Sequence, residues 1–183
     1  MEQNKSVNKE RLQKILSWVE TLVTAVVIAV VLNCFVIVNA VIPTGSMIST
    51  INIGDRVIAN RLAYLFDEAQ RGDIIVFEAP DDPDTLYVKR IIGLPGDTVV
   101  IKDKEVLING QPLRETYIFE ETLGDWGPYI VPQNSYFCMG DNRNASADSR
   151  YWQNTYVPKD NIKGKVVFRY YPEFTFYKNV SYE

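Results

Sequence analysis

Apolar residues dominate one continuous stretch near the start of the chain. From Leu22 to Ile42 there is no charged residue, and the apolar positions are spread all round a helix instead of forming one stripe. A helix needs about 20 such residues to cross the hydrocarbon core of a bilayer. The pattern predicts a transmembrane anchor over residues 18–42, preceded by a polar tail over residues 1–17.

Charges flank this run unequally. Four basic residues precede it, Lys5, Lys9, Arg11 and Lys14, whereas the first charge after it is Asp55. The positive-inside rule therefore predicts a single-pass protein of the cell membrane, with a cytoplasmic N-terminus and residues 43–183 on the other side.

A cleavable signal peptide is the alternative for this run. Val38-Asn39-Ala40 carries small residues at the spacing of a cleavage site. The run is longer than the apolar region of about 7 to 15 residues in a signal peptide, which favours an uncleaved anchor.

After the anchor, the apolar positions change to the two-residue alternation of strands. Short runs rich in Val, Ile, Tyr and Phe alternate with Gly, Pro, Asn and Asp clusters, and a hairpin is expected over residues 97–111. The predicted strands are 56–60, 73–79, 85–92, 98–101, 105–109, 136–139 and 165–171. A helix competes only over 10–20 and 59–70, and residues 119–127 and 141–154 are expected to be ordered loops. The fold class is mainly β, one transmembrane helix followed by an antiparallel β domain.

Composition and charge narrow the possible functions. The 183 residues allow one modest domain plus an anchor, and 46% hydrophobic residues indicate a folded chain. A net charge of −4 provides no basic surface, so no nucleic-acid partner is expected. Cys34 lies in the apolar run and Cys138 in the body, so both are interpreted as small buried apolar residues.

The chain contains no histidine. This absence excludes a Ser-His-Asp triad, a Cys-His dyad and every histidine-containing metal site. A serine nucleophile would therefore need a carboxylate or a neutral lysine as its base.

Ser46 is the candidate nucleophile because of its position in Pro43-Thr44-Gly45-Ser46-Met47. It follows Ile42 by four residues, so it lies at most about 13 Å from the apolar run. A lysine base needs an apolar site that penalises its charged form. Lys89 and Lys165 both lie in apolar strand patterns, and the pattern does not choose between them. Lys89 is also consistent with an edge-strand lysine that discourages aggregation.

Polar residues are concentrated between Gly140 and Arg150. This stretch holds two arginines, two aspartates, two serines and two asparagines directly after a predicted strand. A solvated loop is one interpretation. Asp and Arg at this density can also form bidentate pairs that fix a loop, and a hydroxyl held there can orient a catalytic amine. We favour a rigid scaffold.

These motifs, taken together and in this order, resemble those of bacterial type I signal peptidases, particularly Gram-positive members with a single anchor. The resemblance rests on the Ser46 turn, Gly54-Asp55, Arg71-Gly72-Asp73-Ile74-Ile75-Val76-Phe77, the stretch from Tyr87 to Asp97, and the stretch from Gly140 to Arg150. The family usually has proline where this chain has Ser49.

The resemblance implies a role for each matching residue. Ser46 would be the nucleophile and Lys89 the general base, and the Thr44 hydroxyl and Ser46 amide would form the oxyanion hole. Ser146 would orient the Lys89 amine, and the loop would be held by Asp141, Arg143, Asp148 and Arg150. Shallow substrate pockets would be lined by Ile42, Met47, Ile51, Tyr87 and Val88. No cofactor or metal is implied.

The implied substrates are the signal peptides of secreted precursors, cleaved after small residues at Ala-x-Ala sites near the lipid bilayer. The implied body is an antiparallel β catalytic domain of signal-peptidase type over residues 43–183, and oligomeric state is not determined. A self-cleaving Ser/Lys protease of the repressor type lacks support, because no basic DNA-binding domain is present. A membrane-anchored β module that only binds proteins would require Ser46 and Lys89 to lie far apart. Ser6-x-x-Lys9 matches a penicillin-binding motif by chance, since no Lys-Thr-Gly follows.

Overall fold

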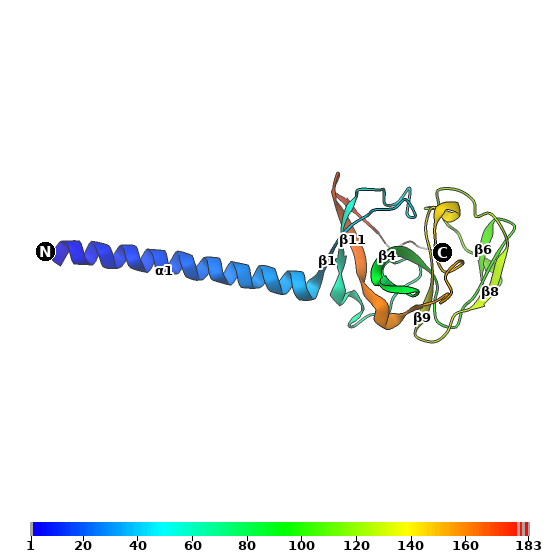
Figure 1. The fold of residues 1–183 in the computed structure, drawn as a ribbon, viewed down its shortest axis with the longest axis horizontal. Coiled ribbons are helices and arrows are strands. Elements are labelled where there is room, and N and C mark those ends of the chain that lie inside the picture. Colours follow the sequence, from blue (N-terminus) through cyan, green and yellow to red (C-terminus); the bar gives the residue numbers. More distant parts are fainter. Residues whose placement is uncertain (1, 179, 181, 183) are drawn as a thin grey trace. The chain divides into compact units, whose positions relative to one another are not determined.

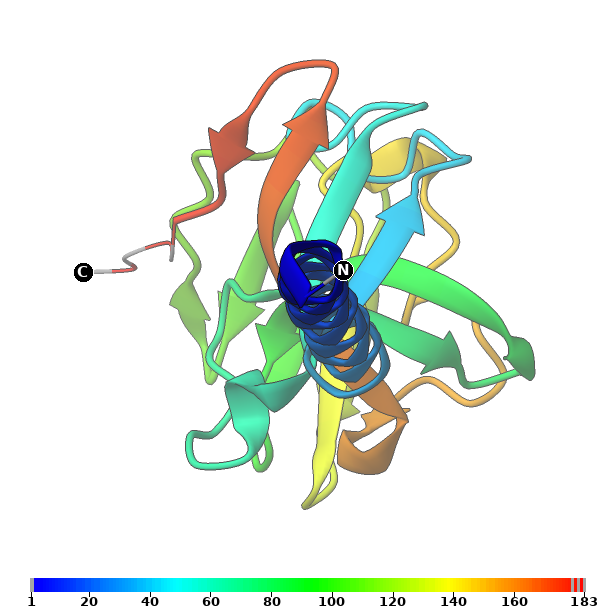
Figure 2. The ribbon, with the colours of Figure 1, turned by 90° about the vertical axis from the view of Figure 1, so that its left-hand side faces the viewer.

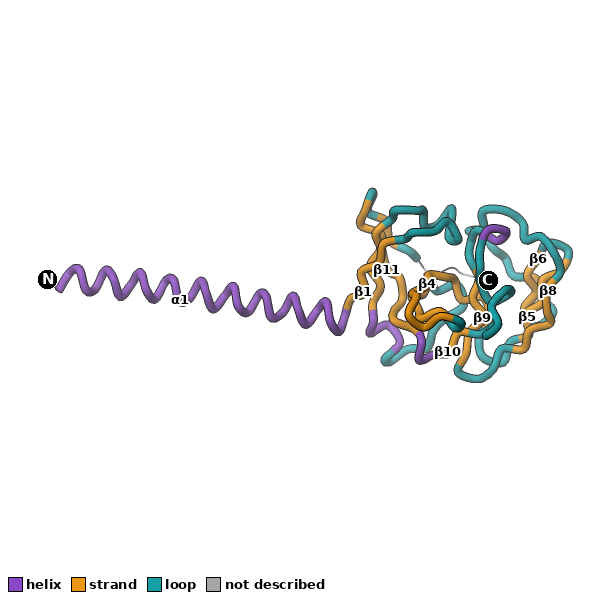
Figure 3. The backbone as a smooth tube through the Cα atoms, in the orientation of Figure 1, coloured by secondary structure: helices purple, strands orange, loops and turns teal. Residues whose placement is uncertain are grey.

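A computed structural model describes residues 2–178, 180 and 182 of the chain. Contacts divide it into two units, residues 1–37 and 38–183, each of which is described by itself. Figure 1 labels the elements of both units, and Figure 3 separates the helical unit from the strand-rich one by colour.

The first unit is the predicted apolar helix. α1 spans Glu2–Val31 and continues as the π-helical turn η1, Leu32–Val36. The segment Arg11–Val36 is long and apolar enough to cross a membrane. The prediction of one N-terminal apolar helix is therefore confirmed.

The helix ends earlier than the apolar run. Ile37–Val41 forms the strand β1, so residues 37–42 are not helical, although the anchor was predicted to extend to residue 42. Val38 and Ile42 are buried in a cluster that includes Val57 of the neighbouring strand β2. An uncharged apolar run is equally compatible with a lipid-facing helix and with a buried strand. The pattern therefore did not show where the helix ends and the strand begins.

The second unit contains two antiparallel sheets. The larger has the strand order β1-β2-β11-β3-β4-β9-β10, with β12 paired to β11. Figure 2 shows β1, β2 and β11 side by side. Its further strands are β2 Arg56–Asn60, β3 Ile74–Ala79, β4 Asp82–Gly93, β9 Ser135–Met139, β10 Val157–Pro158, β11 Ile162–Tyr171 and β12 Thr175–Phe176.

The smaller sheet has the order β7-β6-β5-β8. Its strands are β5 Thr98–Lys102, β6 Glu105–Ile108, β7 Gln111–Pro112 and β8 Trp126–Ile130. β5 and β6 form the predicted hairpin, and its turn residues Asp103 and Lys104 have φ of 51° and 72°. The described part of the unit also has three single-turn 3-10 helices, η2 Arg61–Tyr64, η3 Arg143–Ala145 and η4 Lys159–Asn161.

All seven predicted strands are present, and the mainly β fold class is confirmed. The competing helix over residues 59–70 is reduced to η2, because residues 59 and 60 belong to β2. The expected loop 119–127 overlaps β8 at its end. The pattern missed β8 because Gly127 and Pro128 interrupt it, yet its Tyr129 pairs with Val99 of β5.

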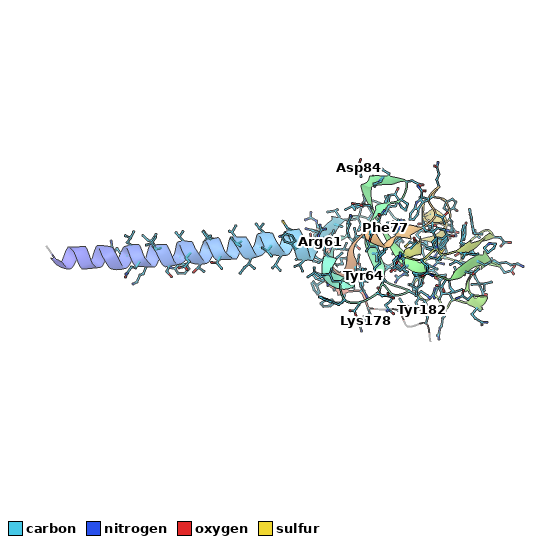
Figure 4. The ribbon with its side chains drawn as sticks, turned by 90° about the horizontal axis from the view of Figure 1, so that it is seen from below. Arg61, Tyr64, Phe77, Asp84, Lys178 and Tyr182 are labelled. Atoms are coloured by element: carbon cyan, nitrogen blue, oxygen red, sulfur yellow. The ribbon has the colours of Figure 1, made fainter. Side chains whose placement is uncertain are left out.

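Three apolar clusters fill the second unit. One of them supports the chain around residue 46: Met47 and Ile51 are 1% and 0% exposed and pack with Val57 and Val76. Burying each such side chain stabilises the fold by about 1.5 to 3 kcal/mol. Figure 4 shows Phe77 of β3 inside the body and Asp84 at the outer tip of β4. The first half of β4 is exposed and its second half is buried.

Candidate active site

Ser46 lies in a turn that is fixed on both sides. Met47 and Ile51 bury their side chains beneath the turn, and the Ile51 amide donates to the Met47 carbonyl at 2.8 Å. On the N-terminal side, Ile42 donates to the Asp55 carbonyl and accepts from the Gly54 amide. The Ile48–Ser49 peptide bond is cis. Ser46 itself is buried, with 8% of its surface exposed.

Lys89 reaches Ser46 from the buried half of β4. Its Nζ lies 2.5 Å from Ser46 Oγ, across a separation of 43 residues. Lys89 is 5% exposed and pairs across the sheet with Ile75, which is fully buried. Burial lowers the pKa of Lys89 to about 8, against the opposing effect of the Asp148 and Asp141 carboxylates. Desolvation thus outweighs the attraction of the nearby negative charges, and a sizeable fraction of the amine is neutral near pH 8.

Lys165, the other candidate base, is directed elsewhere. Its Nζ forms an ion pair with Asp73 Oδ1 at 2.6 Å, and the same carboxylate accepts a hydrogen bond from the Tyr64 hydroxyl at 2.9 Å. A charged amine paired with a carboxylate is not available as a base for Ser46. The structure therefore brings Lys89, and not Lys165, to the serine.

Arg90, the neighbour of Lys89, is buried as well. Two-residue alternation sends the two side chains to opposite faces of β4, and both faces are covered. Arg90 donates to both oxygens of Asp141, at 2.8 and 2.6 Å, and lies over the Tyr117 ring at 3.9 Å. Asp141 also accepts from the Thr50 hydroxyl at 2.5 Å. Asp141 thereby joins the 140–150 loop to β4 and to the Ser46 turn.

The rest of the loop is held by two further buried ion pairs. Asp148 accepts two hydrogen bonds from the Arg150 guanidinium, both at 2.8 Å, one from the Arg150 amide at 3.3 Å and one from the Gly140 amide at 3.1 Å. Arg143 pairs with Glu115 through both guanidinium Nη atoms. Glu115 and the Arg90 partnership were missed by the sequence analysis. Glu115 lies in an irregular segment with no motif, and Arg90 lies inside the matched stretch from Tyr87 to Asp97 without a predicted partner.

Ser146 does not make the hydrogen bond that its implied role requires. Its Oγ is buried and has no hydrogen-bond partner among the described residues, so the expected bond to the Lys89 amine is not present. The hydroxyl is nevertheless close to the site. A Cβ added to Gly140 would lie 2.3 Å from Ser146 Oγ and 2.3 Å from the Ser46 carbonyl oxygen, so only glycine fits at position 140.

A groove of about 600 Å³ opens beside Ser46 and Lys89. Its lining is mainly apolar and includes four of the five predicted pocket residues, Ile42, Met47, Tyr87 and Val88, together with Ala40, Val76, Ala145 and Ala147. Ile51 is not part of the lining. It is fully buried in the cluster below the turn, because the turn directs it toward β2 and the core.

Two hydrogen-bond donors border the same groove. Thr44 lines it, and the Ser46 amide donates to no acceptor among the described residues. The Ser46 carbonyl, in contrast, accepts from the Asn142 amide at 3.0 Å. A serine hydroxyl, a buried amine, a backbone amide without a described acceptor and an apolar groove therefore lie close together.

A family model described as "Signal peptidase, peptidase S26" matches residues 15–171. The chain belongs to this family. Its relatives include signal peptidase I of Leptolyngbya laminosa, 42% identical over 161 residues, which cover 84% of this chain and 78% of the relative. Signal peptidase I S of Bacillus subtilis is 38% identical over 179 residues, 92% of this chain and 95% of the relative. A crystal structure of a signal peptidase I from Enterococcus faecalis is 34% identical and covers 54% of this chain and 97% of its own, with a TM-score of 0.48.

Membership of the signal peptidase family confirms the resemblance drawn from the motifs. The chain is an enzyme, a protease that acts in signal peptide processing. The family match includes most of the apolar helix, the Ser46 turn, β4 and the 140–150 loop.

Proposed function

We propose that this signal peptidase cleaves secreted precursors with a Ser46–Lys89 dyad, in which Ser46 is the nucleophile and Lys89 the general base. The observation that carries the proposal is the 2.5 Å contact between Lys89 Nζ and Ser46 Oγ inside a site that lowers the pKa of the amine to about 8. A serine hydroxyl becomes an effective nucleophile only when an adjacent base takes its proton.

The chemistry follows in two halves. The neutral Lys89 amine takes the Ser46 proton while Oγ adds to the scissile carbonyl, and the carbonyl π electrons move to oxygen. The Ser46 amide and the Thr44 hydroxyl stabilise this oxyanion, where one lost donor costs about 3 kcal/mol. The Lys89 ammonium then protonates the leaving amine of the mature protein. Lys89 then takes a proton from water, and the hydroxide adds to the acyl carbonyl. The bond between the acyl carbon and Ser46 Oγ breaks, Oγ takes the proton back from the Lys89 ammonium, and the signal peptide leaves as its carboxylate.

The loop residues support the dyad without taking part in the reaction. Asp141, with Arg90 and Thr50, holds the loop against β4 and the Ser46 turn. The Asp148–Arg150 and Arg143–Glu115 pairs keep the loop in one shape. Ser146 stays a candidate to orient the Lys89 amine, because its buried hydroxyl has no hydrogen-bond partner among the described residues and lies close to the Ser46 carbonyl.

We propose that the groove binds the signal peptide as an extended strand and selects alanine-sized side chains. β1 is the last strand at one end of the larger sheet, so one of its edges has no partner among the described strands. β4 pairs with β9 only from Arg90 onward, so this edge of β4 also has no described partner before Arg90. Residues of both strands line the groove. Main-chain hydrogen bonds to such edges would give affinity, and the bulk of Ile42, Met47 and Tyr87 would exclude large side chains.

Membrane topology is part of the proposal. The apolar helix would cross the cell membrane with the N-terminus in the cytoplasm, leaving the body outside. Ser46 follows the last helical residue, Val36, by ten residues, so the active site would remain near the bilayer, where the cleavage site of a translocating precursor emerges. Protection of an N-terminal tag from protease added outside intact cells tests this orientation; digestion of the tag would contradict it.

The decisive experiment compares three variants of the full chain in detergent with a precursor carrying an Ala-x-Ala site. Ser46→Ala and Lys89→Met should abolish cleavage while the protein stays folded. Lys165→Met is the matched control, because Lys165 is a strand lysine paired with Asp73 instead of Ser46. The folded Lys165→Met protein should retain cleavage. Near-normal activity of either dyad variant would exclude the proposed mechanism.

A further inference from the structure

Asn142 makes two hydrogen bonds to consecutive carbonyls of the Ser46 turn. Its backbone amide donates to the Ser46 carbonyl at 3.0 Å, and its side-chain Nδ2 donates to the Gly45 carbonyl at 3.0 Å. A carbonyl oxygen only accepts, so the NH₂ end of the Asn142 side chain must face Gly45.

The bond to Gly45 also determines where the Ser46 amide points. The Gly45 carbonyl and the Ser46 N–H belong to one planar trans peptide unit, in which the two groups point in opposite directions. A donor that holds the carbonyl on the side of the 140–150 loop therefore directs the N–H to the opposite side. Glycine places little steric restriction on this plane, so an external contact is needed to hold it. The Ile48 amide, at 3.2 Å, is the other described donor to the Gly45 carbonyl.

Asn142 is itself held between two buried ion pairs. Asp141 pairs with Arg90, and Arg143 pairs with Glu115; each of these four side chains is no more than 5% exposed. The residue that orients the Ser46 peptide is therefore attached to a segment with very little freedom. Hydrogen bonds aimed at a developing charge are most effective when their direction is preset in this way.

We infer that Asn142 is a positioning residue for the oxyanion hole: its side-chain amide holds the Gly45–Ser46 peptide plane so that the Ser46 N–H meets the oxyanion. The inference rests on the proposed role of Ser46 as nucleophile and extends it to a residue outside the dyad. Asn142 would not touch the substrate, and its effect would be confined to the transition state.

The test uses the full chain in detergent and two peptide inhibitors with the same Ala-x-Ala sequence. One ends in an aldehyde, to which Ser46 Oγ can add to form a tetrahedral hemiacetal with an oxygen in the oxyanion position. The other ends in the corresponding alcohol, which has no carbonyl carbon to which Ser46 Oγ could add. Both inhibitors make the same contacts in the groove, so these contacts contribute equally to the two inhibition constants. The ratio of the two constants therefore measures the stabilisation of the tetrahedral oxygen.

Two variants probe Asn142, and one serves as control. Asn142→Ala removes the donor, and Asn142→Asp keeps the shape and the backbone N–H but places a carboxylate against the Gly45 carbonyl. The control is Asn144→Ala in the same loop, whose side chain bonds to the Leu123 amide and the Glu121 carbonyl instead.

Both Asn142 variants should lose about 10- to 100-fold in kcat with KM within about threefold, somewhat less than the loss from removing an oxyanion donor itself. Aldehyde inhibition should weaken by the same factor and alcohol inhibition should not change. For Asn142→Ala, which adds no charge, the midpoint of the pH–rate profile should stay in place. Asn144→Ala should behave like the wild type.

Equal weakening of aldehyde and alcohol inhibition, or unchanged rates in a folded Asn142→Asp protein, would overturn the inference. If the wild type binds the aldehyde much more tightly than the alcohol, and both Asn142 variants show the same preference as the wild type, then only the role of Asn142 is refuted. If the wild type does not discriminate at all, or Ser46→Ala retains activity, the proposed function fails with it.

Discussion

Lys89 should destabilise the folded protein at neutral pH, and replacing it should reveal by how much. The site lowers the pKa of the amine from an ordinary value of 10.5 to about 8, chiefly through burial. At pH 7 the folded state must therefore keep the amine charged in an apolar site or give up its proton. Either course costs free energy, because the amine has a higher affinity for the proton in the unfolded chain.

The size of this cost follows from the pKa difference. A difference of one in pKa corresponds to about 1.4 kcal/mol, so lowering it from 10.5 to about 8 costs the fold about 3 kcal/mol at pH 7. Lys89→Met removes the amine and keeps a similar apolar stem. It also removes the bond to Ser46, which is worth about 1 kcal/mol. We expect the variant to be more stable than the wild type by about 2 kcal/mol at pH 7, and to be inactive.

The pH dependence provides a signature with a definite sign. Between pH 8 and 10.5 the unfolded chain holds the Lys89 proton and the folded protein does not, so wild-type stability rises with pH through this window. The Lys89→Met variant has no such term. The gain in unfolding free energy of Lys89→Met over the wild type should be largest below about pH 8 and should disappear by about pH 10.5. Above that pH only the small cost of the lost hydrogen bond remains.

Urea unfolding of the full chain in mild detergent measures these differences. Trp152 packs against Phe77 and Tyr87 at ring distances of 5.8 Å and reports on the body. Lys165→Met is the matched control and should be destabilised, because it leaves the buried Asp73 carboxylate without its ion-pair partner. A Lys89→Met protein that is less stable than the wild type at pH 7, or whose advantage does not shrink at high pH, would refute this reasoning.

Three further predictions concern activity and processing. The kcat/KM of the wild type should rise about tenfold from pH 7 to pH 9 with a midpoint near 8, because only neutral Lys89 accepts the proton; a pH–rate profile flat over this range would count against a lysine base. Gly140→Ala should reduce activity by at least about tenfold, because its Cβ would lie 2.3 Å from the Ser146 hydroxyl and the Ser46 carbonyl; wild-type rates would show that the loop yields freely. The chain should not cut itself after Ala40, because residues 37–41 form β1 and Val38 is buried; the intact mass of membrane-purified protein will show whether residues 1–40 remain.

Ile51, which the resemblance implied in the pocket wall, and residues 37–42, which the uncharged run predicted in the anchor, both lie elsewhere in the structure. Both lie in apolar sequence, and apolar character alone does not separate a pocket wall from a core, or a lipid-facing helix from a buried strand. Their positions depend on what packs against them, here β2 and its neighbours in one cluster. β8 also depends on its neighbour. Its glycine and proline interrupt the strand pattern in the sequence, but the segment pairs with β5 in the folded protein.

The polar loop was recognised by composition, but its partners were not. Asp and Arg at high density predicted ion pairs, and only the Asp148–Arg150 pair forms within the loop itself. Asp141 pairs with Arg90 and Arg143 with Glu115, across separations of 51 and 28 residues. Charge pairing has no fixed spacing in sequence, so these contacts require the sheet and the irregular segment after β7 to be in place.

The sequence by itself determined the broad chemistry of this protein. An uncharged run long enough for a bilayer predicted the helix, alternating β-branched residues predicted the sheet, and the absence of histidine restricted any serine nucleophile to a lysine or carboxylate base. The residue pattern did not choose between Lys89 and Lys165, because both occur in equivalent apolar strands, and only the family resemblance favoured Lys89. Only the tertiary structure gives the physical reason: strand pairing buries Lys89 beside Ser46, with no ion pair to a carboxylate among the described residues, and the same sheet places Lys165 against Asp73. An amine becomes a base through the desolvation and charges around it, and those are properties of the folded protein.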